Sequence, residues 1–271
     1  MNPSTPAAKQ MLPTHDMNVI DLTPLISAST TVLGEGVSAK VLAVDAPEYP
    51  SSCIKVFKDD VETNVTLKEA MALHSLRHVQ GIPRLLAYCQ QPASFLMTRH
   101  GSCTLSDVIE KKADVKLTKA LLGEILRQLS VILKNIHLAG FVHSDLKPDQ
   151  LALDVEGGAV TVTLLDLGLA TARSQCHNHV APEYYLGSPA EPASDIYSLG
   201  ALVRASAKIK DPQIKQLIKQ SQKEKPESRP TIDEFIQIFE QLAQAPSTSA
   251  SPAQSKDTEE GKPAEETNRQ Q

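Results

Sequence analysis

The segment from Phe141 to Asp166 constrains the fold most strongly, because it joins a polar loop to a hairpin that ends at an aspartate. The loop reads His143-Ser144-Asp145-Leu146-Lys147-Pro148-Asp149-Gln150. After it, Gly157-Gly158 is a turn signal, and apolar residues then alternate with threonines from Val160 to Leu164. That alternation predicts a half-buried strand. We expect the strand to carry Asp166 to a cleft beside the loop.

This order of motifs resembles the catalytic loop and the Asp-Phe-Gly motif of eukaryotic-type protein kinases. The resemblance implies that Asp145 accepts a hydrogen bond from the attacking hydroxyl and that Lys147 steadies the moving phosphoryl group. It also implies that Asp166 and Gln150 bind magnesium. Ser144 stands where the family has Arg, Gln150 where it has Asn, and Leu167 where it has Phe.

A glycine-rich segment lies nearer the N-terminus, with Leu33, Gly34 and Gly36 before Val41. A glycine pattern alone also suggests a dinucleotide-binding turn. A dinucleotide site needs a helix after the glycines, whereas here β-prone residues continue to Val44. The pattern therefore predicts strand, glycine loop, strand, which in kinases covers the ATP phosphates.

The next predicted strand, Ser52–Lys58, resembles the kinase strand whose lysine holds the ATP α- and β-phosphates. That lysine is Lys55, and its expected ion-pair partner is Glu69 on the following helix. Glu69 and Leu73 lie one helical turn apart, so one face can present both the carboxylate and a core side chain. Taken singly, Lys55 reads as a surface lysine and Glu69 as part of a solvated helix face.

The fifth predicted strand, Ser94–Thr98, resembles the strand that leads to the kinase hinge. Met97 then corresponds to the gatekeeper at the back of the adenine pocket. The hinge runs from Thr98 to His100, and its backbone is expected to read the adenine edge. A methionine at such a position is also an ordinary core residue.

Helical spacing of apolar residues from Leu122 to Ile136 predicts a long helix that Gly140 ends. Three later motifs resemble kinase features. Ala181-Pro182-Glu183 resembles the end of an activation segment, Arg229 its ion-pair partner, and Asp195 the anchor of the catalytic-loop backbone. Thr231 and Glu234 form a predicted capping box at the start of the last helix.

The predicted activation segment, residues 169–180, is short and places Cys176 where kinases usually have Thr or Ser. No Arg precedes Asp145 to receive a loop phosphate. We therefore expect no control by phosphorylation at Thr171 or Ser174. Cys176 with His177 and His179 suggests zinc only weakly, because a fourth ligand is missing nearby.

Composition limits the remaining possibilities. The chain has 271 residues, 41% of them hydrophobic, which suffices for one two-lobed domain or for two small domains. Its net charge of -5 argues against a general polyanion binder, so no nucleic acid is expected. Four cysteines without C-x-x-C spacing, no apolar run before Met17 and no membrane-length stretch predict an intracellular protein.

Two polar regions allow further interpretations. Lysines from Lys208 to Lys225 fit a solvated helix face or a contact with an acidic partner. Residues 246–271 hold no large apolar side chain, which predicts a disordered tail. That tail is either an inert solubilising segment or a phosphorylated one.

The sequence thus predicts an α+β, two-lobed protein kinase-like fold with a β-rich N-lobe and a mainly helical C-lobe. We expect an N-terminal extension at 1–25, partly disordered, a kinase-like domain at 26–245, with lobes at 26–98 and 101–245, and the tail at 246–271. The implied activity is ATP- and magnesium-dependent phosphorylation of Ser or Thr in a protein substrate. The alternative is a pseudokinase that serves as a scaffold, with or without bound nucleotide.

Overall fold

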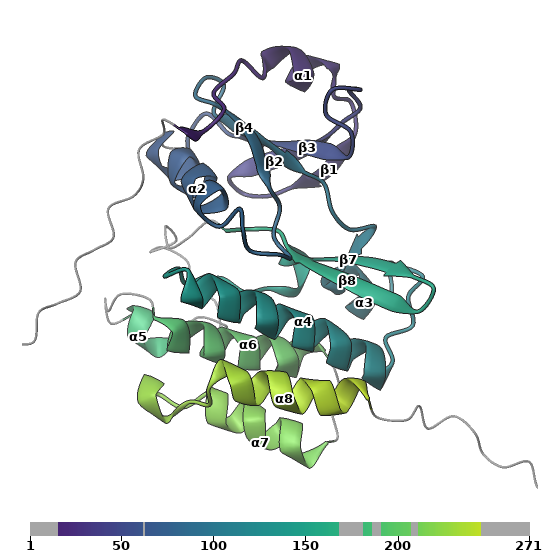
Figure 1. Cartoon of the computed structure of the whole chain (residues 1–271), viewed down its shortest axis with the longest axis vertical. Helices are drawn as coiled ribbons and strands as arrows, with labels where there is room; N and C mark the ends of the chain where they lie inside the picture. Colours follow the sequence, from purple (N-terminus) through teal and green to yellow (C-terminus); the bar gives the residue numbers. More distant parts are fainter. Residues whose placement is uncertain (1–15, 62, 168–180, 186–190, 207–210, 245–271) are drawn as a thin grey trace, which may run out of the picture.

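The computed structural model has two lobes, and it describes residues 16–61, 63–167, 181–185, 191–206 and 211–244. Figure 1 shows the small lobe with α2 beside its sheet. In the larger lobe α4, α6, α7 and α8 lie in stacked rows below the β7–β8 hairpin. The predicted two-lobed α+β fold is confirmed.

An antiparallel five-stranded sheet in the order β1-β2-β3-β5-β4 forms the small lobe. The elements of this lobe are α1 (Thr23–Ala28), β1 (Val32–Glu35), β2 (Ala39–Val44), β3 (Ser52–Phe57), α2 (Thr63–Ser75), β4 (Leu85–Cys89) and β5 (Ser94–Thr98). Side chains alternate between the two faces of each strand. One face packs on α2, and Ile54, Leu96 and Val44 on the other face form a smaller core of their own.

The sheet edge at β4 is covered by a segment that we call the N-terminal strap, residues 16–28. Val19 pairs in parallel with Tyr88, and the Ile20 amide donates a 3.0 Å hydrogen bond to the Tyr88 carbonyl. Leu22 is fully buried in the smaller core, where α1 lies against β2. The predicted domain start at residue 26 falls inside α1.

The large lobe begins with a second, three-stranded sheet in the order β6-β7-β8. The elements of this lobe are β6 (Cys103–Thr104), α3 (Leu105–Ile109), α4 (Lys119–Leu138), η2 (Pro148–Gln150), β7 (Leu151–Glu156), β8 (Ala159–Leu164), α5 (Pro182–Tyr185), α6 (Pro192–Ser206), α7 (Pro212–Ser221), η3 (Pro226–Ser228) and α8 (Ile232–Ala243). The β7–β8 hairpin turns at Gly157 and Gly158, as predicted, and both have positive φ.

Helix α4 is the main support of the large lobe. Its apolar face is buried against α8, β8 and α6. Gly123 allows the closest approach, because a Cβ atom there would lie 2.5 Å from the backbone nitrogen of Ala243. The helix ends where Gly140 adopts a φ of 82°, which favours glycine.

Candidate active site

The polar loop after α4 is held by one buried carboxylate. Asp195 of α6 is fully buried and accepts 2.8 Å hydrogen bonds from the backbone amides of His143 and Ser144. Its Oδ2 atom also lies 2.8 Å from Nε2 of His137, at the end of α4. Sequence reasoning expected the bonds from Asp195 to the loop backbone but gave His137 no role. The loop is therefore fixed jointly by α4 and α6.

Ser144 adopts a conformation that few residues other than glycine tolerate. Its φ is 72°, and its Oγ atom is buried without a hydrogen-bond partner among the described residues. Such backbone strain is found at functional sites, where the surrounding structure holds it in place. Here the bonds to Asp195 hold the loop, so that the next residue, Asp145, turns toward the space between the lobes.

Asp145 lies among the predicted catalytic side chains. Its Oδ2 atom is 2.7 Å from Nζ of Lys147 and accepts a 3.4 Å hydrogen bond from Nε2 of Gln150. The other polar atom of the Gln150 side chain, Oε1, is buried and has no hydrogen-bond partner within the described part of the chain. Buried acceptors are usually satisfied, so this oxygen is available to a bound group.

Lys55 joins the small lobe to the magnesium-binding candidate. Its Nζ atom lies 2.6 Å from Oε1 of Glu69 on α2 and 3.5 Å from Oδ1 of Asp166. The side chain of Lys55 is 12% exposed and that of Glu69 is 6% exposed, whereas Asp166 is 40% exposed. The ion pair expected between Lys55 and Glu69 is therefore formed, and the more open carboxylate faces the interlobe space.

Burial and charge oppose each other in this cluster. Burial, together with the nearby charge of Asp166, raises the pKa of Glu69 to about 7 despite the opposing charge of Lys55. Burial on its own would lower the pKa of Lys55, but the carboxylates of Glu69 and Asp166 raise it above its usual value. Lys55 is therefore a cation at neutral pH, as phosphate binding requires.

A cavity of about 110 Å³ brings five predicted site residues together. Lys55, Glu69, Asp145, Gln150 and Asp166 all line it. Lys147 does not line this cavity, although it contacts Asp145. The cavity thus joins side chains from β3, α2, the catalytic loop and the end of the β7–β8 hairpin.

The predicted nucleotide-binding residues of the glycine loop lie outside this cavity. Leu33 is 46% exposed on β1, and Val41 is half-buried on β2. Between them, the Gly36 amide donates a 2.8 Å hydrogen bond to the Ala39 carbonyl, which closes the turn between β1 and β2. A Cβ atom at Gly34 would meet no atom within 4 Å, so that backbone is open to a ligand. The observed order is strand, glycine loop, strand, as expected.

The predicted hinge continues directly from β5. Met97 is buried in the core that faces α2, and Thr98 Oγ1 lies 2.8 Å from Nε2 of His100. Thr98 Oγ1 also accepts a 2.9 Å hydrogen bond from the amide of Arg84. Burial and the charge of Arg84 lower the pKa of His100, although Asp154 acts in the opposite direction. The His100 imidazole is therefore neutral at physiological pH.

Glu183 and Arg229 form the ion pair that sequence reasoning expected. Two parallel hydrogen bonds of 2.6 and 2.7 Å join the guanidinium to the carboxylate, and the Arg229 side chain has no exposed surface. The same guanidinium donates to the carbonyls of Ala193, Lys223 and Glu224. The pair fastens α5 to the start of α6 and to the loop that precedes η3.

A magnesium ion fits the oxygen atoms that this site presents. Asp166 supplies a partly exposed carboxylate, and Gln150 supplies the buried amide oxygen that has no partner in the described ranges. Magnesium in phosphate-transfer sites typically takes one or two protein oxygens and completes its shell with phosphates and water. The described residues contain no group of three or more His, Cys, Asp or Glu side chains that could hold a metal by themselves.

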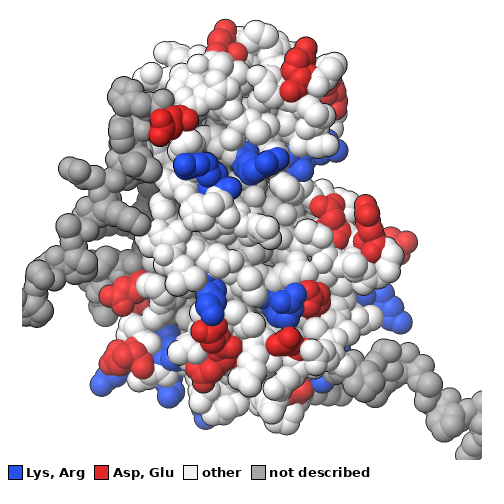
Figure 2. Space-filling view, viewed as in Figure 1, with Lys and Arg blue, Asp and Glu red and all other residues white. Residues whose placement is uncertain are grey.

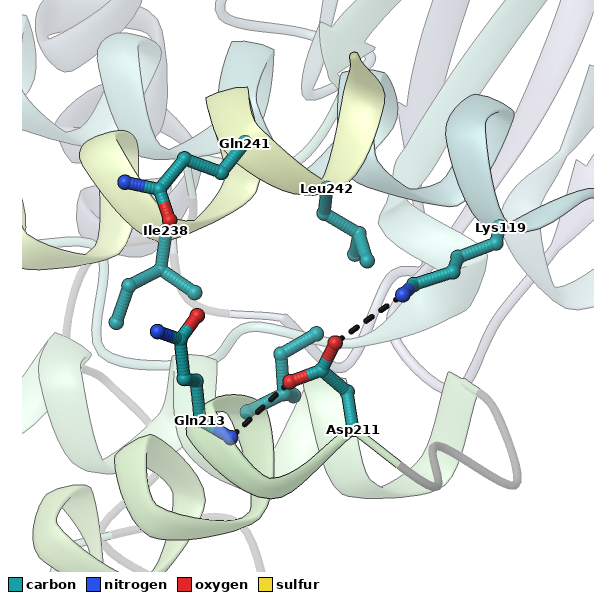
Figure 3. Close-up of a pocket in the computed structure, with 7 residues that line it drawn as sticks. Lys119, Asp211, Gln213, Ile238, Gln241 and Leu242 are labelled. Carbon is teal, nitrogen blue, oxygen red and sulfur yellow. Dashed lines mark hydrogen bonds and ion pairs between the residues drawn. The ribbon is translucent and has the colours of Figure 1, made fainter. Parts of the chain in front are cut away.

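A second hollow lies far from these residues, between the start of α4 and the helices α7 and α8. Figure 3 shows its Lys119–Asp211 ion pair, 3.1 Å long, and the 3.0 Å hydrogen bond that the Gln213 backbone amide donates to Asp211. Ile238 and Leu242 supply apolar walls. Its charged groups already satisfy each other, and it holds none of the predicted site residues.

Several predictions lie outside the described residues. They concern the activation segment with Thr171, Ser174, Cys176, His177 and His179, the lysines at 208 and 210, and the tail at 246–271. Of the lysines that the structure does describe in the Lys208–Lys225 region, all four are exposed: Lys215, Lys219, Lys223 and Lys225. Figure 2 shows Lys and Arg beside Asp and Glu on the visible face of the large lobe. None of the described helices combines the length and apolar character needed to cross a membrane.

The fold and the arranged site define a protein kinase-like domain. The family model described as "Protein kinase domain" matches residues 28–212, and the chain belongs to this family. The solved kinase domain of Mycobacterium tuberculosis PknI has the same fold. It superimposes with a TM-score of 0.62 at 18% sequence identity and covers 79% of this chain and 95% of that one.

Two curated relatives are Ser/Thr protein kinases by name. Serine/threonine-protein kinase PknA of Mycobacterium tuberculosis is 33% identical over 109 residues, which are 36% of this chain and 24% of PknA. Serine/threonine-protein kinase 1 of African swine fever virus is 24% identical over 139 residues, 48% of this chain and 46% of the viral protein. The matched segments thus span from about a quarter to about half of these relatives.

Proposed function

We propose that this protein is an ATP- and magnesium-dependent kinase that transfers the γ-phosphate to Ser or Thr of a protein substrate. The observation that carries the proposal is the single cavity lined by Lys55, Glu69, Asp145 and Asp166. Phosphoryl transfer needs little covalent chemistry from the protein and depends on positioning and charge stabilisation. The cavity supplies a cation held by a buried carboxylate, a candidate base and an open carboxylate.

Each residue has a role that its surroundings support. Asp145 orients the substrate hydroxyl and accepts its proton, and Lys147, 2.7 Å from that carboxylate, steadies the γ-phosphate. Lys55 holds the α- and β-phosphates while Glu69 fixes the position of its ammonium group. Leu33, Gly34, Gly36 and Val41 cover the nucleotide, and Met97, Thr98 and His100 line the adenine end. Lys147 in the catalytic loop favours Ser/Thr over Tyr substrates.

Asp166 and Gln150 are the residues that would hold magnesium. When bound, the metal neutralises charge on the phosphates. Among the described residues no group bonds to the buried Oε1 atom of Gln150, which supports its role as a ligand. The same side chain donates to Asp145 through Nε2, so this amide contacts the proposed base and would offer its oxygen to the metal.

The site is proposed to work without activation-segment phosphorylation. Ser144 leaves no Arg beside Asp145 to receive a loop phosphate, and the Lys55–Glu69 pair is formed in the unmodified chain. We further propose an intracellular location. An acidic partner is proposed for the exposed lysines of α7 and the loop after it, for which charge is the only support.

A scaffolding pseudokinase is the second candidate. Two observations favour it: Ser144 stands where kinases have Arg, with a buried hydroxyl that lacks a hydrogen-bond partner among the described residues, and Gln150 stands where they have Asn. A scaffold, however, has no chemical need for Lys55, Glu69, Asp145, Lys147 and Asp166 together. Retention of the full set favours the enzyme.

Substitution of Gln150 by Asn separates the two candidates. Asn would restore the shorter amide, and errors of about 1 Å in catalytic geometry can cost up to about 100-fold in rate. We expect Gln150→Asn to raise transfer from labelled ATP to a basic protein substrate, by on the order of tenfold. The magnesium-free reaction gives the background. If neither the wild type nor Gln150→Asn transfers phosphate above that background, the scaffold is favoured.

A further inference from the structure

The register of the small sheet places two aromatic rings beside Lys55. Phe57 lies two residues along β3, so its side chain projects from the same face of the sheet as Lys55. Phe95 on β5 is the direct cross-strand partner of Lys55. Residues directly opposite on neighbouring antiparallel strands share a face and interact. Both rings and the lysine therefore lie on the side of the sheet that packs against α2.

The distances are those of cation–π contacts. The Lys55 Nζ atom lies 5.3 Å from the centre of the Phe57 ring and 5.9 Å from the centre of the Phe95 ring. The rings contact each other with centres 5.7 Å apart and planes tilted by 53°. Phe95 is fully buried and Phe57 is 6% exposed. Phe57 also lines the cavity that contains Asp145 and Asp166.

We propose that Phe57 and Phe95 are positioning residues that hold the Lys55 ammonium group against Glu69. We call the two rings the aromatic seat. Its consequence for catalysis rests on the proposed function. In an active kinase, the small lobe itself would maintain the Lys55–Glu69 ion pair, without a phosphate on the activation segment. The seat also explains how that pair is formed in a chain whose catalytic loop lacks the Arg.

The physical basis is the charge distribution of an aromatic ring. A ring face is electron-rich and attracts a cation within about 6 Å, more strongly when the cation is shielded from water. A lysine side chain has a flexible four-carbon stem, so its ammonium group would otherwise sample several positions. Here the carboxylates of Glu69 and Asp166 and the two rings restrict it together. Leucine at position 57 would fill similar space but would offer no such face.

Nuclear magnetic resonance of lysine-labelled protein tests the seat without any need for phosphate transfer. The Lys55 signals are identified by their loss in Lys55→Met. In the wild type we expect the ring currents to shift the Lys55 ε-methylene signals upfield. The shift should fall in Phe57→Leu and remain in Phe57→Tyr, which keeps the ring. If Phe57→Leu fails to fold, Phe57→Met replaces the ring with a flexible side chain that can fill the space.

Nucleotide affinity provides the functional readout. Phe57→Leu is expected to raise the KM for ATP about 3- to 10-fold with a smaller effect on kcat. Phe57→Tyr, which keeps the ring, is expected to have a KM close to that of the wild type. Val56→Ala, on the opposite face of the same strand, controls for loss of packing. Unshifted Lys55 signals in the wild type, or equal KM values in Phe57→Leu and Phe57→Tyr, would overturn the proposal. Shifted signals without any phosphate transfer would instead refute only the proposed activity.

Discussion

Glu183 shows how one residue can connect distant parts of the large lobe. Burial by itself raises the pKa of Glu183, but hydrogen bonds from Arg229 and Ser194 bring it below its usual value of 4.5. A group with a lowered pKa in the folded state contributes stability above its unfolded pKa. It loses that contribution as the pH falls through the folded pKa. The Glu183–Arg229 pair should therefore stabilise the fold at neutral pH and fail in acid.

We expect Glu183→Gln to cost about 3 kcal/mol of unfolding free energy at neutral pH, because it leaves the buried Arg229 guanidinium uncompensated. The cost should shrink as the pH falls from about 4.5, where the carboxylate of the unfolded chain becomes protonated, through the lower pKa of Glu183 in the folded protein. Urea denaturation across this range measures the difference between the two proteins. Glu227→Gln, at an exposed position of η3, is the control. A cost that does not change with pH would contradict this assignment.

At the scale of elements, the N-terminal strap is the largest feature that the sequence did not predict. Its residues carry no periodic pattern long enough to indicate a helix or strand, and its pairing partner, Tyr88, lies far along the chain. Leu22 is nevertheless fully buried against β2, β3 and β5 residues. Because polar residues and prolines surround the strap, its sequence did not indicate that it covers the edge of the small sheet.

Leu22→Ala is expected to destabilise the protein by about 2–4 kcal/mol, since it removes a fully buried side chain and leaves a cavity. Val19→Ala is the matched control within the strap. Val19 is 57% exposed, and substitutions at such positions usually change stability by less than about 0.5 kcal/mol. Thermal or urea unfolding measures both variants. Equal stability of the two would show that the strap contributes no core packing.

The packing of α4 on α8 gives a second prediction for the elements. Alanine is ordinarily better than glycine inside a helix by about 1 kcal/mol. At Gly123, however, the added Cβ atom would lie 2.5 Å from the Ala243 nitrogen and 2.8 Å from the Leu242 carbonyl carbon. We expect Gly123→Ala to destabilise by about 1–3 kcal/mol, because the helices must separate. A gain in unfolding free energy would mean that α8 is not held this closely.

For the whole molecule, the order of motifs along the chain was enough to predict the two lobes. Local patterns placed the β7–β8 hairpin, the end of α4 and the capping box at Thr231, because each depends on residues close in sequence. Contacts between distant parts of the chain that the family motifs do not include escaped prediction. The rings of Phe57 and Phe95 beside Lys55 belong to this class, as does His137 beside Asp195.

The candidate site followed the same division. The family pattern indicated Lys55, Glu69, Asp145 and Asp166, and the structure gathers these four around one cavity. The pattern could not indicate the strained backbone of Ser144, because strain arises from the anchoring by Asp195 rather than from the residue itself. The catalytic roles of the four residues around the cavity are proposals.

Phosphate transfer from labelled ATP, with magnesium, shows whether the protein is a kinase that acts through Asp145. Transfer to the protein itself and to a basic protein substrate is compared between the wild type and Asp145→Asn, whose amide cannot accept the hydroxyl proton as a carboxylate does. We expect incorporation by the wild type that falls by at least about 100-fold in the variant. Equal incorporation by the two, or none by the folded wild type, would contradict it.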